Sequence, residues 1–289
     1  MVNLLDRLRE FFLRKGKSVA GIDIGSSSIK VVELYRRRGR VVLKTYGELA
    51  LGPYAGMEIG RATNLPQEKI ADALRDLLRE SGVAAKQCGI AIPTASSLVS
   101  LIEMPVLDEG QLAQMIPFEA RKYIPLPVSE VTLDWWVIPR EEVKTAGIES
   151  RAGSGVTKGK VVDVLLAAIL NDTISKCREI VARSGLECSF FEIEIFSVIR
   201  SVLGRELAPV LVADIGAATT KLAVVEGGIA KSSHMVNRGS QDVTFALART
   251  LNISVREAEK FKRVVGLEAP PDEREARDVS VSVFQYIFA

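Results

Sequence analysis

Two stretches of eight residues carry the side chains with the clearest chemical potential. The sequence DIGSSSIK runs from Asp23 to Lys30, and DIGAATTK, from Asp214 to Lys221, repeats its frame. Each copy begins with an aspartate, continues with a glycine and small residues, and ends with a lysine. Because a carboxylate, a glycine bend and an ammonium group recur in the same order, the repeat predicts two turns with the same chemistry.

The residues inside these turns are suited to binding phosphate oxygens. We expect Gly25 and Gly216 to adopt backbone angles that are closed to other residues. The small side chains that follow leave main-chain N–H groups free to point into one concavity, which is a phosphate nest. The small residues of the two nests are Ser26, Ser27 and Ser28 in the first copy and Ala217, Ala218, Thr219 and Thr220 in the second. Lys30 is expected to point either across the sheet or toward the phosphate.

The two aspartates predict a metal ion beside the phosphate. Asp23 and Asp214 each end the apolar run that precedes the turn. Two carboxylates beside an anion are favourable only if a cation such as hydrated Mg²⁺ lies between them. A single turn of this type is often only a tight hairpin, whereas two copies in one frame favour phosphate binding.

Apolar runs on both sides of each turn predict the elements that position these residues. VAGI precedes the first turn and PVLVA the second, while VVEL and LAVV follow them. Buried strands on either side of a polar turn form a β-hairpin, so the chain is predicted to contain two similar half-domains.

The segments between the hairpins alternate between strand and helix patterns. Helices are predicted from about Pro66 to Ser81 and from Asp108 to about Lys122, with proline and glycine or acidic residues as their start and stop signals. The run VVDVLLAAIL predicts a strand after a polar loop at 140–160. Strand, helix, strand and strand from about 86 to 170 therefore predict a compact inserted subdomain.

Composition excludes several classes of protein. With 289 residues, 47% hydrophobic and 26% charged, the chain is long enough for two cores. A net charge of +2 gives no field that argues for nucleic acid. The spacing of Cys88, Cys177 and Cys188 favours reduced thiols in a cytoplasmic protein, and the lone His234 has no second histidine for a zinc site.

The chain is not predicted to span a membrane. Its longest apolar run has ten residues, well under the roughly twenty that a bilayer requires, and we expect no signal peptide. Residues 3–15 predict an amphipathic helix, which would lie on a membrane, on a partner or on its own domain. Its apolar positions are Leu4, Leu5, Leu8, Phe11 and Phe12.

The paired turns and the sequence between them resemble a known family. Asp-x-Gly hairpins in two copies are typical of the phosphate loops of the actin-like ATPase superfamily. Within it, the chain is most similar to the PilM family of type IV pilus assembly proteins. The blocks that carry this resemblance are GIDIGSSSIKVVEL, MIPFEARKYIPLPVSEVTLDWWVI, FEIEIFSV at 191–198 and AEKFKR at 258–263. Together they span most of the chain.

The resemblance implies a fold and a division into parts. The fold is an α/β actin-like (ribonuclease H-like) duplicated domain with an inserted strand-helix-strand-strand subdomain. Residues after Ala258 contain no Gly-Gly pair, where the family has a turn that covers adenosine. We therefore expect a truncated second half-domain and a terminal stretch, VSVSVFQYIFA, without a packing partner. The expected parts are an N-terminal segment 1–17, half-domain I at 18–85 and 171–206, the inserted subdomain 86–170 and half-domain II at 207–289.

The resemblance also implies cofactors and site residues. It implies ATP with Mg²⁺, held by the two phosphate loops and the two aspartates. Glu259 and Lys262 match the element that holds ribose and adenine, although the pair taken alone is only a surface ion pair. Glu194 matches the residue that orients the attacking water. The alternative is that Glu194 only begins a helix, and we expect at most a slow ATPase.

The partners implied by the resemblance lie at the inner membrane. The family member would be a cytoplasmic, peripheral scaffold in pilus assembly and twitching motility that signals to the pilus motor ATPases. It would bind the N-terminal peptide of a PilN-like membrane protein in a groove between half-domain I and the inserted subdomain, through IPFEARKYIPLP. A homo-oligomer and a related type II secretion role stay open. The alternatives are a sugar or small-molecule kinase and an FtsA-like filament protein.

Overall fold

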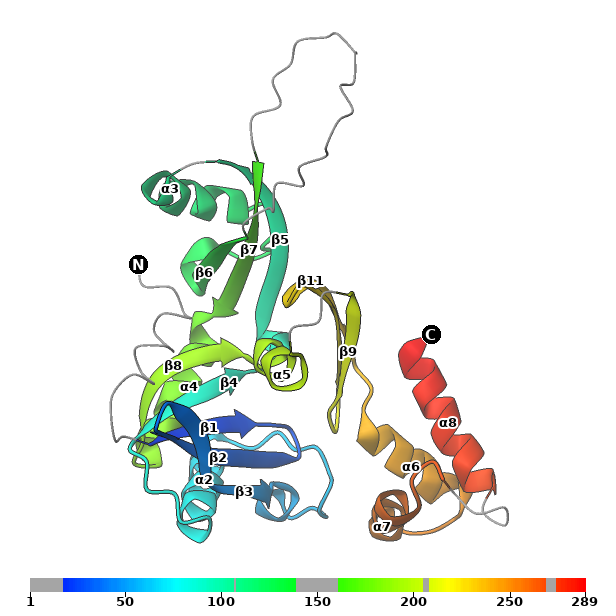
Figure 1. The fold of residues 1–289 in the computed structure, drawn as a ribbon. Helices are drawn as coiled ribbons and strands as arrows, with labels where there is room; N and C mark the ends of the chain where they lie inside the picture. The colour runs from blue at the N-terminus through cyan, green and yellow to red at the C-terminus, as the bar shows by residue number, and fades with distance from the viewer. Residues whose placement is uncertain (1–17, 107, 139–160, 205–207, 269–273) are drawn as a thin grey trace, which may run out of the picture. The chain divides into compact units, whose positions relative to one another are not determined.

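The computed structural model describes residues 18–106, 108–138, 161–204, 208–268 and 274–289. The chain forms two compact units, which are Met1–Ala95 with Thr173–Ala289 and, inserted between them in sequence, Ser96–Asp172 (Figure 1). The predicted helix at 3–15 and the predicted loop at 140–160 lie outside the described residues.

A five-stranded sheet forms the first half of the larger unit. Its strands are ordered β3-β2-β1-β4-β8, with antiparallel pairs β3-β2 and β2-β1 and parallel pairs β1-β4 and β4-β8. The predicted hairpin is β1–β2, in which Asp23 lies directly opposite Lys30. The strands are β1 (Val19–Ile24), β2 (Ser28–Arg37), β3 (Arg40–Ala50), β4 (Gln87–Ile92) and β8 (Glu187–Ile193).

Two helices contribute apolar side chains to the core of this half. Helix α2 (Gln67–Glu80) packs on β2 and β3, and the predicted helix at 66–81 is confirmed. Arg75 of α2 donates a hydrogen bond of 3.1 Å to the carbonyl of Arg183, which ends α4 (Asn171–Arg183). The buried side chains include Ala20, Ile22, Leu74, Leu77, Ile90, Ile180 and Val181, and this core fixes the hairpin that carries the first turn.

The second half of the larger unit repeats the hairpin and adds three helices. Strands β9 (Val210–Ile215), β10 (Thr220–Glu226) and β11 (Ile229–Val236) form an antiparallel sheet in the order β11-β10-β9. Lys221 lies directly opposite Asp214, as Lys30 does opposite Asp23. The helices are α6 (Ser240–Thr250), α7 (Val255–Val265) and α8 (Arg274–Phe288).

The terminal apolar stretch has a packing partner after all. It forms α8, and its residues Val279, Val283 and Phe284 pack against Val243 and Leu247 of α6. In Figure 1, α6, α7 and α8 form one group of helices. The expectation that this stretch would lack a partner within the chain is therefore wrong, because Val279, Val283 and Phe284 lie on one face of the helix.

The inserted unit is a three-stranded antiparallel sheet with one helix. The strands β5 (Ser97–Pro105), β7 (Val161–Leu170) and β6 (Val131–Ile138) lie in the order β5-β7-β6. Helix α3 (Glu109–Ala120) begins at a capping box formed by Asp108 and Gln111. Its side chains Leu112, Ile116 and Ala120 belong to one core with Ile102, Met104, Val164 and Leu166 of the strands.

The boundary of the inserted unit differs from the expectation. We expected the subdomain to start at about residue 86, but β4 (Gln87–Ile92) pairs with β1 and β8 of the first sheet. The unit begins at Ser96, because parallel strands paired on both sides are part of the larger sheet. Both halves of the larger unit, moreover, belong to one compact body.

Candidate functional site

The two turns have the same internal hydrogen bond. The N–H of Gly25 donates to the carbonyl of Ser28 at 3.0 Å, and the N–H of Gly216 donates to the carbonyl of Thr219 at 2.9 Å. The repeated residues therefore form two turns of the same geometry, each placed between the strands of a hairpin.

The two glycines are required for space and not for unusual backbone angles. Among the described residues, neither Gly25 nor Gly216 has a positive φ, so the expectation that they need angles closed to other residues is wrong. A Cβ atom on Gly25 would lie 3.0 Å from the carbonyl oxygen of Ser28, and one on Gly216 would lie 2.9 Å from that of Thr219. A side chain would therefore require the turn to shift at Gly216 and would crowd it at Gly25.

Segment 61–63 links the first turn to the second half of the unit. The carbonyl of Ser26 accepts two hydrogen bonds from Thr63. The N–H of Thr63 donates at 2.8 Å and its side-chain hydroxyl donates at 3.1 Å. The N–H of Ala62 donates to the side-chain carbonyl of Gln241 on α6 at 3.2 Å. The first turn and α6 are thus held by one short stretch of chain. The carbonyl of Ser27 accepts from the N–H of Leu51 at 2.8 Å.

The start of α6 supports the second turn. The N–H groups of Ser240 and Gln241 donate to the carbonyls of Gly216 and Ala217 at 2.9 and 3.0 Å. Gly239 permits this approach, because a Cβ atom there would lie 2.5 Å from the carbonyl oxygen of Ala217. The first N–H groups of a helix lack partners within it, and here two of them are used to fix the turn.

Two of the predicted hydroxyl groups are engaged within the protein. Ser28 is 7% exposed and donates to Glu48 at 2.7 Å. Thr220 is fully buried and donates to the carbonyl of Arg238 at 2.9 Å. These two residues start strands β2 and β10, so their hydroxyls hold the hairpins in place.

A lysine outside the predicted set of site residues lies at the centre of the site. The Nζ atom of Lys221 is 3.1 Å from Glu194 and 3.2 Å from Asp214. The other carboxylate oxygen of Glu194 accepts from the N–H of Thr94 at 2.8 Å. The signal was present in the repeat, because Lys221 takes the position of Lys30 in the second copy.

Glu194 begins a helix and also belongs to the site. It is the first residue of α5 (Glu194–Val202), which follows β8 directly. Both of its carboxylate oxygens have partners, one in each half of the unit. The two alternatives for this residue are therefore not exclusive.

The electrostatics place both aspartates in one site. Burial is the largest effect on Asp23 and raises the pKa of its carboxyl above the ordinary value. Lys30, 3.7 Å away, and Lys221 oppose this rise, while the charges of Glu194 and Asp214 add to it. The carboxylates thus face a common space, with one lysine from each hairpin beside them.

Lys221 stays charged in this environment. Burial by itself lowers the pKa of Lys221, whose side chain is 12% exposed. The charges of Glu194 and Asp214 and the hydrogen bonds to them outweigh burial, so the pKa lies above the usual value for lysine. The site therefore holds an internal ammonium ion between two carboxylates.

Glu259 and Lys262 on α7 are part of a buried network. The two side chains are 2.7 Å apart and only 10% and 19% exposed. Glu259 also accepts from Thr244 at 2.8 Å and from Arg263 at 2.8 Å. The simpler alternative of a surface ion pair is therefore wrong. Burial raises the pKa of Glu259, but the hydrogen bonds from Lys262, Arg263 and Thr244 outweigh it and hold the pKa below its usual value.

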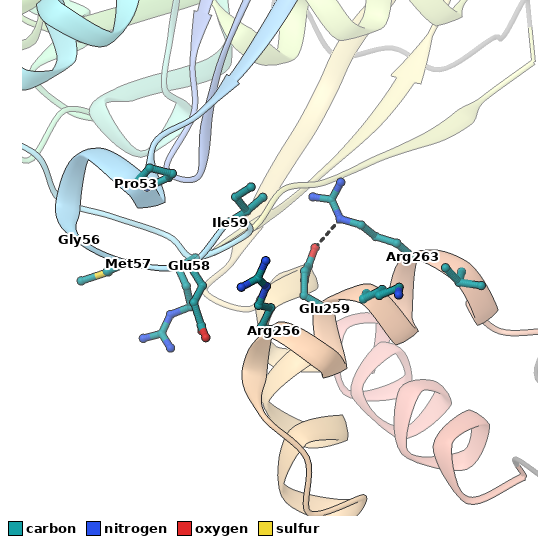
Figure 2. Close-up of a pocket in the computed structure, with 11 residues that line it drawn as sticks. Pro53, Gly56, Met57, Glu58, Ile59, Arg256, Glu259 and Arg263 are labelled. Atoms are coloured by element: carbon teal, nitrogen blue, oxygen red, sulfur yellow. Dashed lines mark hydrogen bonds and ion pairs between the residues drawn. The ribbon is translucent and has the colours of Figure 1, made fainter.

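A hollow of about 920 Å³ lies beside this network. Figure 2 shows it between the loop that carries Pro53 to Ile59 and helix α7. Its wall includes the carboxylate of Glu259, and a Cβ atom on Gly60 would lie 2.7 Å from that carboxyl carbon. Its basic lining residues are Arg61, Arg256, Lys260 and Arg263. The volume and the charge suit a nucleotide-sized anion.

The donor set does not fit a divalent metal ion as the side chains lie. Within the described ranges, no group of three or more histidine, cysteine, aspartate or glutamate residues could hold a metal. Asp23 and Asp214 each have a lysine ammonium within 3.7 Å, where a metal would need to approach. The phosphate nests and the lysines fit an anion, whereas Mg²⁺ coordination by Asp23 and Asp214 stays a prediction that this geometry disfavours.

The cysteines form no disulfide among the described residues. Cys88, Cys177 and Cys188 are all free thiols. No helix in the part of the chain that the structure describes is long and apolar enough to cross a bilayer.

Comparison with known proteins decides the family. The family model described as type IV pilus assembly protein PilM matches residues 21–275, which is most of the chain. The chain belongs to the PilM family. The predicted family is thereby confirmed, and the chain is a pilus assembly protein.

Solved structures show the fold of this PilM family member. The "PilM-PilN type IV pilus biogenesis complex" is 24% identical with a TM-score of 0.70, covering 93% of this chain and 75% of that chain. Ethanolamine utilization protein EutJ from Carboxydothermus hydrogenoformans is 17% identical with a TM-score of 0.51, covering 93% and 68%. The predicted actin-like ATPase fold is confirmed.

Proposed function

We propose that this PilM family member is an ATP-binding scaffold that also binds the N-terminal peptide of a PilN-like membrane protein. The observation that carries the nucleotide-binding part of the proposal is the pair of equivalent turns, each with a glycine whose Cβ atom would crowd a carbonyl oxygen and a lysine opposite an aspartate. Two such turns in one compact unit are suited to hold a chain of phosphates from both sides.

The chain offers separate places for the phosphates and the nucleoside. Main-chain N–H groups of residues 26–27 and 217–219 would bind phosphate oxygens, with Lys30 and Lys221 as the nearby cations. The hollow beside Glu259 would take the ribose and base. Bound ATP would supply a polyanion that bridges the two halves of the larger unit.

We expect hydrolysis to be slow or absent. A residue that orients an attacking water needs a free carboxylate oxygen aimed at that water. One oxygen of Glu194 accepts from Thr94 and the other from Lys221, so neither is available without a rearrangement. Binding without turnover fits a protein that uses ATP to set its conformation.

The nucleotide half is tested by titrating the full chain with ATP in a calorimeter. Saturable heat with a stoichiometry near one ATP per chain is expected from a single site. The absence of saturable heat would contradict nucleotide binding and leave the family assignment unchanged.

The partner half rests on the exposed face of the inserted unit. The block at 116–127 is divided, because Ile116 and Ile124 belong to the core whereas Phe118 is 65% and Tyr123 is 44% exposed. Leu126 is 41% exposed, and Arg121 lies 5.3 Å from the centre of the Phe118 ring. Exposed aromatic and aliphatic side chains beside an arginine are typical of surfaces that bind a peptide.

The solved complex adds support for the partner. The similar structure is described as a PilM-PilN complex, so a relative of this chain with the same fold binds PilN. We propose a PilN-like protein as the partner here, which would bring the chain to the cytoplasmic face of the inner membrane. Signalling to the pilus motor ATPases and a role in twitching motility extend the same proposal.

A fluorescence titration with the N-terminal peptide of a PilN-like protein tests the partner. Phe118→Ala should weaken binding by about tenfold, because an exposed aromatic anchor of an interface contributes roughly 1.4 kcal/mol or more. Tyr46→Ala is the matched control, since Tyr46 is a 71% exposed aromatic residue of the larger unit. An equal loss for both variants, or binding that does not saturate with wild type, would contradict the proposal.

A further inference from the structure

Lys221 lies between two carboxylates of the site. Its Nζ atom lies within 3.2 Å of both Glu194 and Asp214. It also lies 3.6 Å from where a Cβ atom of Gly216 would stand, which places the ammonium group at the second turn. The positive charge is therefore both between the acidic groups and next to the predicted phosphate nest.

The three side chains are held with little access to water. The side chains of Lys221, Glu194 and Asp214 are 12%, 16% and 30% exposed. Glu194 is fixed further by the N–H of Thr94 at 2.8 Å, and Lys221 lies directly opposite Asp214 in the hairpin. An ion pair with this burial and these hydrogen bonds is a built feature of the site and not a mobile surface contact.

We infer that the ammonium group of Lys221 replaces a divalent cation, so that this chain binds a nucleoside triphosphate without Mg²⁺. The inference rests on the proposed nucleotide binding and concerns its cation. A metal ion between Asp214 and Glu194 would have to displace Lys221 or stand beside its positive charge. The ammonium group of Lys221 neutralises the charge of these carboxylates in the same way, and the protein does not need to bind a metal ion for it.

The first hairpin supplies a second cation to the same space. Lys30 lies 3.7 Å from Asp23, and the pKa of Asp23 responds to Lys30, Lys221, Glu194 and Asp214 together. Three carboxylates and two ammonium groups thus influence one another electrostatically. Each aspartate therefore has a cationic neighbour before the phosphate anion binds. Without these lysines, Mg²⁺ would be needed to offset the repulsion between the carboxylates and the phosphates.

Calorimetric titration of the full wild-type chain with ATP, once in EDTA and once in excess Mg²⁺, tests the inference without any variant. We expect the dissociation constant to differ by less than about threefold between the two conditions. Binding that is about tenfold tighter or more with Mg²⁺ would overturn the inference and leave the proposed nucleotide binding intact. No saturable heat in either condition would overturn both.

Lys221→Met identifies the residue responsible. The variant leaves Asp214 and Glu194 facing the phosphates without a cation, so binding in EDTA should weaken by about tenfold or more and recover in excess Mg²⁺. Unchanged binding in EDTA would overturn the assignment to Lys221. Lys69→Met, on the exposed side of α2, removes the same charge outside the site and should bind as wild type in both conditions.

A measurement without nucleotide gives an independent readout. Adding Mg²⁺ alone should leave the thermal midpoint of the wild-type chain unchanged. The same addition should raise the midpoint of Lys221→Met, because Asp214 and Glu194 then lack their cation and gain from binding the metal. An equal response of both proteins to Mg²⁺ would count against the inference.

Discussion

The two hairpins share one frame of eight residues but have different surroundings. In the first, Lys30 is 54% exposed and lies 3.7 Å from Asp23. In the second, Lys221 is 12% exposed and lies between Asp214 and Glu194. The comparison shows that the repeated motif determines the geometry of the turn. A residue from elsewhere in the chain, Glu194, determines the ion pairs of the lysine that ends the motif.

The surroundings differ because of what packs beside each hairpin. Strand β1 is paired on its far side with β4, and β8 follows. Helix α5 then leaves β8 and brings Glu194 to the second hairpin. Within the described residues, β9 has no strand on its far side, and Leu211 there is 58% exposed. The first hairpin is thus part of a larger core, and the second depends more on α6 and on side-chain contacts.

Adding a side chain at the glycine of either turn should have the largest effect on ATP binding. Gly25→Val and Gly216→Val should each abolish the thermal stabilisation by ATP, because each added Cβ atom meets a carbonyl oxygen at 3.0 or 2.9 Å and opens the nest. A differential scanning measurement with and without ATP checks this.

Ser233→Val serves as the control for the glycine variants. It adds similar bulk at an exposed position of β11 and should retain the full stabilisation by ATP. If Gly25→Val kept the stabilisation and Gly216→Val lost it, the two turns would not be equivalent.

Removing each lysine in the absence of nucleotide should affect the stability of the protein differently for the two hairpins. Lys221→Met should lower the free energy of unfolding by about 2 kcal/mol, because it leaves two poorly solvated carboxylates without their cation. Lys30→Met should change it by less than about 0.5 kcal/mol, as expected for an exposed ion pair. Urea unfolding of both variants provides the comparison, and equal losses would show that burial does not distinguish the two lysines.

The smallest effect is expected from the pH dependence at Asp23. Because its folded-state pKa is raised above the ordinary value of 3.8, Asp23 favours folding below that value and loses this contribution as pH rises through the folded pKa. Asp23→Asn should therefore raise the stability of the nucleotide-free protein at pH 7, and the gain should vanish toward pH 4.

The expected gain for Asp23→Asn is below about 1 kcal/mol, since the side chain is 44% exposed. Thermal unfolding across this pH range measures it, with Asp72→Asn on the exposed face of α2 as the control. A loss of stability at pH 7 would mean that the attraction of the two lysines outweighs burial.

Several parts of the site could be predicted from the residues. The repeated frame predicted both hairpins, and the similarity of AEKFKR to its family pattern indicated Glu259 and Lys262. Their burial could not be predicted, because it depends on Thr244 and Ser240 of α6, to which Lys262 donates at 2.9 and 3.1 Å. The predicted reason for Gly25 and Gly216, unusual backbone angles, was also wrong. These glycines are needed because a carbonyl oxygen lies close to them, and residue propensities do not predict such a distance.

The inserted unit shows the same limit. Alternation predicted its strands, but the strand at 87–92 was assigned to it although it pairs with β1 and β8. Local pattern identifies a strand, and only the pairing of strands decides to which sheet it belongs.

The amino-acid sequence by itself determined the two turns, the strands that hold them and the family of the chain, because these depend on neighbouring residues and on repeated order. The tertiary structure alone decided that Lys221 lies between Asp214 and Glu194 and that the terminal apolar stretch packs as α8 on α6. Both outcomes depend on contacts between segments distant in sequence, whose geometry no local pattern contains.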